Sequence, residues 1–354
     1  MTGTDNTVRS NGSYPVKVKT INGSFDFQLN RFKGVDGSTN YFSLAGFFKE
    51  EGSYYTPKLA EFVSCCATKM SYSSVSEFTL ERCAGVSMSD QHIQEIVRST
   101  AKKIGIQQTE LITNSRSLAS PILELSDIYN SEHKEVMWFE DGISVSQQKS
   151  KRDKIAKIGK ERTTTDIILL ARPNEGYECV VAAENVSLTD LAEAKLKAYY
   201  GGKSINIAVI SDGSRTIKNR CNTLFSQNYT HILDWYHLQK KVKDLMSMIA
   251  PDKSAKVEYI QELNHLLWNG RGREALETLN LYKVRNADKC NELIGYIEKN
   301  IDHIIDYKRR KESCKVIGSG RMEKTVDQIV ARRKKEKAMT CSPTERPCPL
   351  KSKV

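Results

Sequence analysis

The sequence predicts an α/β core that contains an α-helical insertion and is preceded by a mainly helical N-terminal region. Three observations support this fold class. Apolar, strand-like segments alternate with amphipathic helical segments from about Lys134 onward. The pattern is almost wholly helical from about Leu238 to Lys315. The chain has 354 residues, which is long enough for more than one domain.

The N-terminal region is expected to have two parts. Residues 1–55 are β-rich, because the segments 13–20 and 23–32 alternate apolar and polar side chains. Residues 56–125 predict helices over 57–69, 74–84 and 92–104, with Gly85 in the turn before the third helix. A helix, a glycine-containing turn and a capped basic helix suit a helix-turn-helix DNA-binding region, although a plain helical hairpin has the same pattern. No CxxC pair is present, so no structural zinc is expected there.

The first part of the core, residues 130–237, predicts three strands, a helix, a strand, a helix and a strand. These segments are 135–146, 163–173, 177–184, 188–200, 205–213, 215–225 and a strand that begins at 229. This is the order of an RNase H-like core, in which the first and fourth strands are neighbours. The insertion, 238–315, separates it from a last core helix within 316–339, expected from Gly320 to Lys335. Residues 340–354 contain three prolines and predict an irregular tail.

Two acidic residues stand at the ends of apolar strands. Asp141 follows an apolar run and precedes Gly142, and Asp212 likewise ends the apolar run of the strand predicted over 205–213 and precedes Gly213. Such a strand fixes the carboxylate, and the glycine lets a ligand approach the backbone. An ordinary Asp-Gly turn would give the same dipeptide. Glu140 is a weaker alternative because it points to the opposite face of its strand, and Glu184 is another alternative acid.

A third carboxylate comes from Glu323, which lies in the first turn of the last core helix, after a Gly-Ser-Gly sequence. A glutamate that merely interacts with the helix dipole would look the same. Three carboxylates can hold two Mg²⁺ or Mn²⁺ ions, and Arg321 and Lys324 beside them can hold phosphates. His237 stands where a strand becomes a helix, so it either supports the site or packs as an ordinary strand-end histidine.

The charge balance suits a polyanionic partner. The chain has 54 basic and 43 acidic residues, a net charge of +11. Basic residues cluster from Gln147 to Arg162 and from Ile301 to Lys337, although a solvated charged face would also explain them. No apolar run is long enough to span a bilayer, and the first residues lack the apolar segment of a signal peptide. We therefore expect a cytoplasmic protein with reduced cysteines, associated with the nucleoid when it is bound to DNA.

The strings SDGSRTIKNR, ILDWYHLQKKV and GSGRMEKTVDQIVARRKK resemble the ISKra group of DDE transposases from bacterial insertion sequences. The resemblance covers most of the chain, from about Gly23 to Ser342. It implies an RNase H-like catalytic core in which Asp141, Asp212 and Glu323 take the three acidic roles. It also implies metal-dependent cleavage and strand transfer of double-stranded DNA, at element ends and target, by a homo-oligomer bound to that DNA.

The C-terminal sequence departs from the family pattern. Family members continue past the glutamate helix with a Gly-Met-x-Trp-Ser type string and a further helix, whereas this chain has Ala338 and Cys341 at the glycine and tryptophan positions. We therefore hypothesise that the last helix was lost through a degraded or frameshifted gene. The alternative function is then a catalytically inactive or truncated, transposase-derived DNA-binding protein.

Overall fold

The computed structural model describes residues 8–34, 39–41, 48–50, 53–146, 162–174 and 176–326. Two compact units divide the chain within one long helix, the first ending at Gln107 and the second beginning at Gln108. Both units combine helices and strands, so the α/β class is confirmed. No helix in the described ranges has both the length and the apolar character needed to cross a bilayer.

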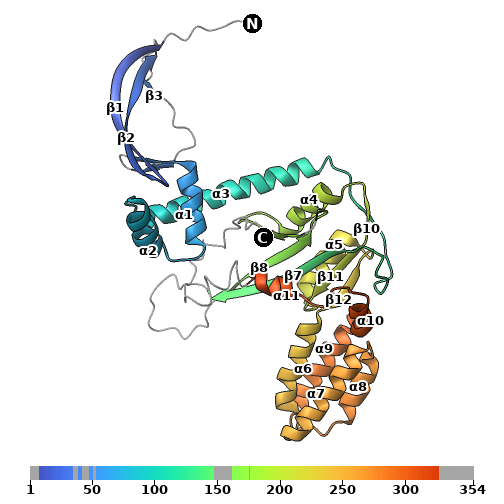
Figure 1. Ribbon diagram of the computed structural model, residues 1–354. Helices are drawn as coiled ribbons and strands as arrows, with labels where there is room; N and C mark the ends of the chain where they lie inside the picture. The colour runs from blue at the N-terminus through green and yellow to red at the C-terminus, as the bar shows by residue number, and fades with distance from the viewer. Residues whose placement is uncertain are drawn as a thin grey trace. The chain divides into compact units, whose positions relative to one another are not determined.

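The first unit begins with a five-stranded sheet in the order β3-β2-β1-β5-β4. Its strands are β1 (Val8–Thr20), β2 (Gly23–Gly34), β3 (Thr39–Tyr41), β4 (Phe48–Glu50) and β5 (Ser53–Tyr55). The first two strands form a long antiparallel hairpin, which Figure 1 shows as curved blue arrows. The described part of residues 1–55 therefore consists mainly of strands.

Helices follow the sheet in the first unit: α1 (Pro57–Ala67), α2 (Tyr72–Ser74), a π-helical segment (Val75–Arg82) and α3 (Asp90–Ser115). The α-helix predicted over 74–84 is wrong in type. Because a π-helix has a wider turn, Val75 and Leu80, five residues apart, both reach the buried core of this unit. Helix α3 is also longer than the predicted 92–104.

The second unit is organised around a sheet in the order β12-β11-β7-β8-β9. Strands β7 (Val136–Ser146), β8 (Arg162–Ala171) and β9 (Tyr177–Val180) are antiparallel neighbours in turn. Strands β11 (Ile207–Ser211) and β12 (Thr230–Leu233) run parallel to β7. The predicted adjacency of the first and fourth strands of this unit's main sheet is therefore confirmed. A separate two-stranded parallel pair joins β6 (Ile122–Leu123) to β10 (Ser204–Ile205).

Both faces of the main sheet are buried, and the side-chain alternation of the strands decides which residues face which helices. Trp138 and Leu170 pack with residues of α4 (Leu188–Tyr200) and α5 (Arg215–Phe225). Phe139 and Leu169, one position away on the same strands, belong to the cluster that contains residues of the helical insertion. Both helices on the first face begin at a serine whose side chain accepts a backbone N–H, Ser187 for α4 and Ser214 for α5.

The segment that follows β12 is helical. It contains α6 (Trp235–Ile249), α7 (Lys253–Trp268), α8 (Gly272–Leu281), α9 (Ala287–Lys299), a 3₁₀ turn (Ile301–His303) and α10 (Tyr307–Glu312). Helix α6 contacts α7 and α9, and α8 contacts α7 and α9, which gives the bundle seen in Figure 1. Helix α11 (Gly320–Val326) then returns to pack against β7. The rest of the predicted 320–335 helix, the tail 340–354 and most of the basic segment 147–162 lie outside the described residues.

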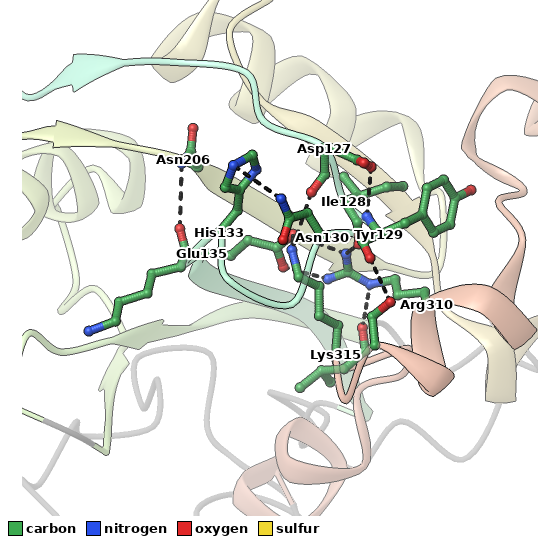
Figure 2. A network of polar contacts seen from close by, with 12 residues as sticks. Asp127, Ile128, Tyr129, Asn130, His133, Glu135, Asn206, Arg310 and Lys315 are labelled. Atoms are coloured by element: carbon green, nitrogen blue, oxygen red, sulfur yellow. Dashed lines mark hydrogen bonds and ion pairs between the residues drawn. The ribbon is translucent and has the colours of Figure 1, made fainter.

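A buried ion-pair network anchors the chain just before the last helix. The Arg310 side chain is fully buried and donates two hydrogen bonds to the Glu135 carboxylate, at 3.0 and 2.7 Å. Lys315 adds a third bond to Glu135 at 2.8 Å. Figure 2 shows these side chains converging, with a further bond from Arg310 to the Ile128 carbonyl. The Ser313 hydroxyl donates to the Tyr129 carbonyl at 2.6 Å. The network ties the segment that leads into β7 to the end of α10.

Candidate active site

The two aspartates predicted for the site lie on neighbouring parallel strands. Ile210 of β11 pairs with Phe139 of β7, and the same offset places Asp212 opposite Asp141. Asp141 lies within β7, and Asp212 directly follows β11. One carboxylate oxygen of Asp141 accepts the Gly142 N–H at 2.8 Å. Both side chains are partly buried, so the sheet itself brings the two carboxylates side by side.

Glu323 approaches the same place from α11. Its backbone N–H donates to the Ser319 carbonyl at 3.0 Å, so it lies in the first turn of that helix. Met322, the preceding residue, is fully buried in the core on the sheet face that carries Phe139. Glu323 itself is exposed. Burial raises the pKa of Asp141, and the nearby negative charges of Asp212 and Glu323 raise it further. The structure therefore brings all three predicted carboxylates within electrostatic reach of one another.

His237 also faces this group. Its Nδ1 lies 3.2 Å from the buried carboxylate of Asp234, and that contact raises the pKa of His237. The negative charges of Asp141 and Asp212 act in the same direction. Burial alone would raise the pKa of Asp234, but its bonds with His237 and Ser319 hold that pKa below the ordinary value. The raised pKa of His237 favours the protonated imidazole beside the carboxylates.

The predicted phosphate-binding residues are both exposed on α11. The guanidinium group of Arg321 lies over the ring of Tyr177, 5.1 Å from its centroid, which fixes the side chain against β9. Lys324 lies one residue beyond Glu323, within the same short helix. Both cations therefore belong to the helix that carries the third carboxylate.

The alternative acids are placed elsewhere. Glu140 points to the opposite face of β7, as predicted, where its buried carboxylate pairs with Arg220 of α5 and accepts the Trp138 indole N–H at 3.3 Å. Glu184 is exposed in a turn, because β9 ends at Val180 rather than continuing through the predicted 177–184. Neither residue joins the three carboxylates.

Sequence reasoning missed one further carboxylate, Asp166. It lies on β8 directly across from Gly142, and Arg220 donates to it at 2.7 Å. Burial raises the pKa of Asp166, and the charge of Asp212 raises it further. A signal was present, since Asp166 is the single acid in an otherwise uncharged strand segment that follows Arg162.

The loop after Asp212 is shaped by contacts from the insertion. Gly213 has a φ of 79°, and a Cβ there would lie 2.4 Å from the Asn300 side-chain oxygen. The Tyr296 hydroxyl donates to the Asp212 carbonyl at 3.4 Å. Asp212 in turn accepts the Ser214 N–H at 2.8 Å, just before α5 begins. The end of α9 therefore fixes the backbone that presents Asp212.

The donor set can be compared with what a metal ion requires. Within the described ranges, no three His, Cys, Asp or Glu side chains converge closely enough to hold a metal ion as they stand. The chemistry of the donors nevertheless fits a hard divalent cation, because carboxylate oxygens are the ligands that Mg²⁺ and Mn²⁺ prefer. A cation would also offset the mutual repulsion that raises the pKa of Asp141.

Comparisons with known proteins do not define a family. No protein-family model matches the chain, and no curated protein matches it. Among solved structures, the chain is similar to one described as the Drosophila P element transposase strand transfer complex, with 11% sequence identity and a TM-score of 0.27. The match covers 68% of this chain and 62% of that one, so it spans less than two thirds of the transposase chain. A likeness of this extent carries no conclusion about fold or function.

Proposed function

We propose that this chain is a DDE-type DNA transposase whose second unit is an RNase H-like catalytic core. One observation carries the proposal: Asp141 and Asp212 stand at matching positions on adjacent parallel strands, and the charge of Glu323 reaches them from a helix packed on β7. The strand order, with the antiparallel pair β8 and β9 on one side of β7 and the parallel strands β11 and β12 on the other, supports the same core. The sequence resemblance described above supports transposition rather than another nuclease reaction.

In this proposal Asp141, Asp212 and Glu323 hold two Mg²⁺ or Mn²⁺ ions. When bound, such ions activate a water or a DNA 3′-OH as nucleophile and stabilise the leaving oxygen of an in-line displacement. The parallel strands fix the two aspartates in register, which spares the reaction the cost of ordering them. The glutamate arrives on a separate helix, so its position depends on how that helix is held against the sheet.

The surrounding cations bind and orient DNA. Two of them, Arg321 and Lys324, lie on the same helix as Glu323 and contact phosphates next to the scissile one. The side chain of Arg321 is held by its contact with the Tyr177 ring. His237, whose raised pKa favours the protonated form, donates a hydrogen bond toward a phosphate oxygen near Asp141 and Asp212. The partners are double-stranded element ends and target DNA, bound by a homo-oligomer.

A cleavage and strand-transfer assay tests this function. Purified protein is incubated with labelled duplexes from both flanks of its own gene, with Mg²⁺ or Mn²⁺, and the nicked and joined products are separated on a denaturing gel. Asp212→Asn and Glu323→Gln are expected to reduce product formation at least about hundredfold, since each removes an interaction needed in the transition state. Glu184→Gln is the matched control, because it neutralises an exposed acid outside the site.

The outcomes separate the candidate functions. Metal-dependent joining that disappears in both site variants and persists in the control supports the transposase. Cleavage without joining identifies a nuclease with the same site. Salt-sensitive DNA binding by the wild type, with no cleavage in either metal, identifies instead an inactive, transposase-derived DNA-binding protein.

A further inference from the structure

Asp234 is an unusual helix cap. Its side chain is fully buried between β12 and α6, and one carboxylate oxygen accepts the N–H groups of Tyr236 and His237 at 2.7 and 3.4 Å. Those two bonds are all that capping of α6 requires. Asp252, by comparison, caps α7 from an exposed position with a single bond to Ala255 at 2.9 Å. A fully buried carboxylate is costly unless many donors surround it, so capping alone does not explain the burial of Asp234.

The second oxygen of Asp234 reaches the start of the glutamate helix. It accepts the Ser319 N–H at 2.9 Å and a short hydrogen bond from the Ser319 hydroxyl. Ser319 is itself 4% exposed, and its carbonyl accepts the Glu323 N–H at 3.0 Å. The same aspartate oxygen lies 3.2 Å from His237 Nδ1. One carboxylate therefore contacts both the imidazole beside the site and the residue that begins α11.

Backbone contacts extend this junction in both directions. The Asp234 N–H donates to the Ser211 carbonyl at 2.8 Å, next to Asp212. The Trp235 N–H donates to the Ile317 carbonyl at 3.2 Å, on the approach to α11. Gly318 lies so close to Tyr236 that a Cβ at Gly318 would meet the ring at 2.4 Å. The segment that leads into α11 is thus fixed to the segment that joins β12 to α6.

We propose that Asp234 is a positioning residue that sets where Glu323 lies relative to Asp141 and Asp212. The inference rests on the proposed function for the role of the three acids. A short series of hydrogen bonds connects Asp212 to Glu323. Ser211, beside Asp212, bonds the backbone of Asp234, and the Asp234 side chain bonds Ser319. The Ser319 carbonyl in turn accepts the Glu323 N–H. Glu323 is exposed, and no residue in the described ranges anchors its side chain, so the register of its helix depends on this junction and on the burial of Met322.

The test uses Asp234→Asn in the full chain. Asparagine keeps an oxygen to cap α6 but places an NH₂ group opposite the Ser319 N–H, so it removes the acceptor of that N–H and spares the cap. Asp252→Asn is the matched control, since it makes the same exchange at a helix cap that does not contact α11. Ser319→Ala removes the hydroxyl from the other side and leaves Asp234 intact as a cap, in case Asp234→Asn does not fold.

The first readout needs neither metal nor activity. Hydrogen exchange at the Glu323 amide is expected to accelerate about 10- to 100-fold in Asp234→Asn and in Ser319→Ala. This corresponds to about 1.4–2.8 kcal/mol at 1.4 kcal/mol per tenfold. Exchange in α7 is expected to stay unchanged in both. Exchange at Glu323 that stays within about twofold of wild type in both folded variants overturns the proposal.

The second readout separates positioning from general structural support. Mn²⁺ affinity, measured by titration calorimetry, is expected to fall about tenfold in Ser319→Ala, which keeps the Asp234 carboxylate beside His237, while DNA affinity falls by a smaller factor. An equal loss of both affinities would contradict a positioning role. If the wild type binds no Mn²⁺ and cuts no DNA, the proposed function fails, and hydrogen exchange still decides whether Asp234 holds the helix.

Discussion

Gly213→Ala is expected to destabilise the second unit strongly, for two separate reasons. The residue has a φ of 79°, where a side chain costs about 1–2 kcal/mol. A Cβ there would also lie 2.4 Å from the Asn300 side-chain oxygen and 3.0 Å from a Leu233 methyl. Overpacking of this kind costs about 1–3 kcal/mol. The total is about 2–5 kcal/mol, or a fall in Tm of about 4–20 °C for a unit of this size.

A double-mutant cycle separates the two contributions. Asn300→Ala removes the clashing oxygen but also the hydrogen bond from Asn300 to the Tyr296 carbonyl at 2.9 Å, so alone it costs about 1 kcal/mol or more. Combined with Gly213→Ala, it should recover about 1–3 kcal/mol relative to additivity, because the clash with Asn300 vanishes while the φ cost and the contact with Leu233 remain. Urea unfolding followed by circular dichroism gives each free energy of unfolding.

Two results would refute this reasoning about Gly213. A loss of less than about 1 kcal/mol in Gly213→Ala would mean that the loop after Asp212 relaxes freely. Additive effects in the double variant would mean that Asn300 does not press on that loop. Either result would also weaken the view that the insertion fixes the position of Asp212.

Three further predictions concern buried charges in the second unit. Burial lowers the pKa of His231 to about 3, so the folded chain binds fewer protons than the unfolded chain below about pH 6.5. The free energy of unfolding should therefore fall by about 1 kcal/mol between pH 7 and 5.5. His231→Gln should remove that part of the pH dependence in urea titrations. Arg310→Met should cost about 3–5 kcal/mol by leaving Glu135 short of its main partner, and adding Glu135→Gln should recover at least about 1 kcal/mol in the same assay. Arg220→Leu should lower the free energy of unfolding by a similar amount, since the Glu140 side chain is fully buried. A fall in Tm no larger than that of the exposed control Arg271→Leu would contradict the buried pairing.

Much of the second unit follows from local sequence pattern. The strands alternate or are continuously apolar, and the helices have capping residues and amphipathic faces, so element type and order could be predicted. The closeness of Asp141 and Asp212 also follows, because each comes after an apolar run on one of two strands that the element order makes neighbours. The helices of the first unit were harder to predict. Residues 74–84 have a helical composition, and nothing in their pattern distinguishes a π-helix from an α-helix.

The residues that support the site could not be predicted, because their partners lie far away in the chain. Asp234 and Ser319 are 85 positions apart, and the contact of Asn300 with Gly213 spans a similar distance. Hydrophobic periodicity reports which face of an element is buried, but it carries no information on which distant side chain completes a turn. The Asp-Gly and Gly-Ser-Gly sequences were visible, while the reason for glycine at each position was not.

These long-range contacts give the helical insertion a part in the site. Tyr296 and Asn300, at the end of α9, hold the backbone around Asp212 and Gly213. Asp234, just before α6, contacts both Ser211 and Ser319. The first and last long helices of the insertion therefore begin and end on the residues that present the carboxylates, and they pack directly against each other. Because α6 and α9 pack against each other, these contacts join the insertion both to the strand end that carries Asp212 and to the start of the helix that carries Glu323.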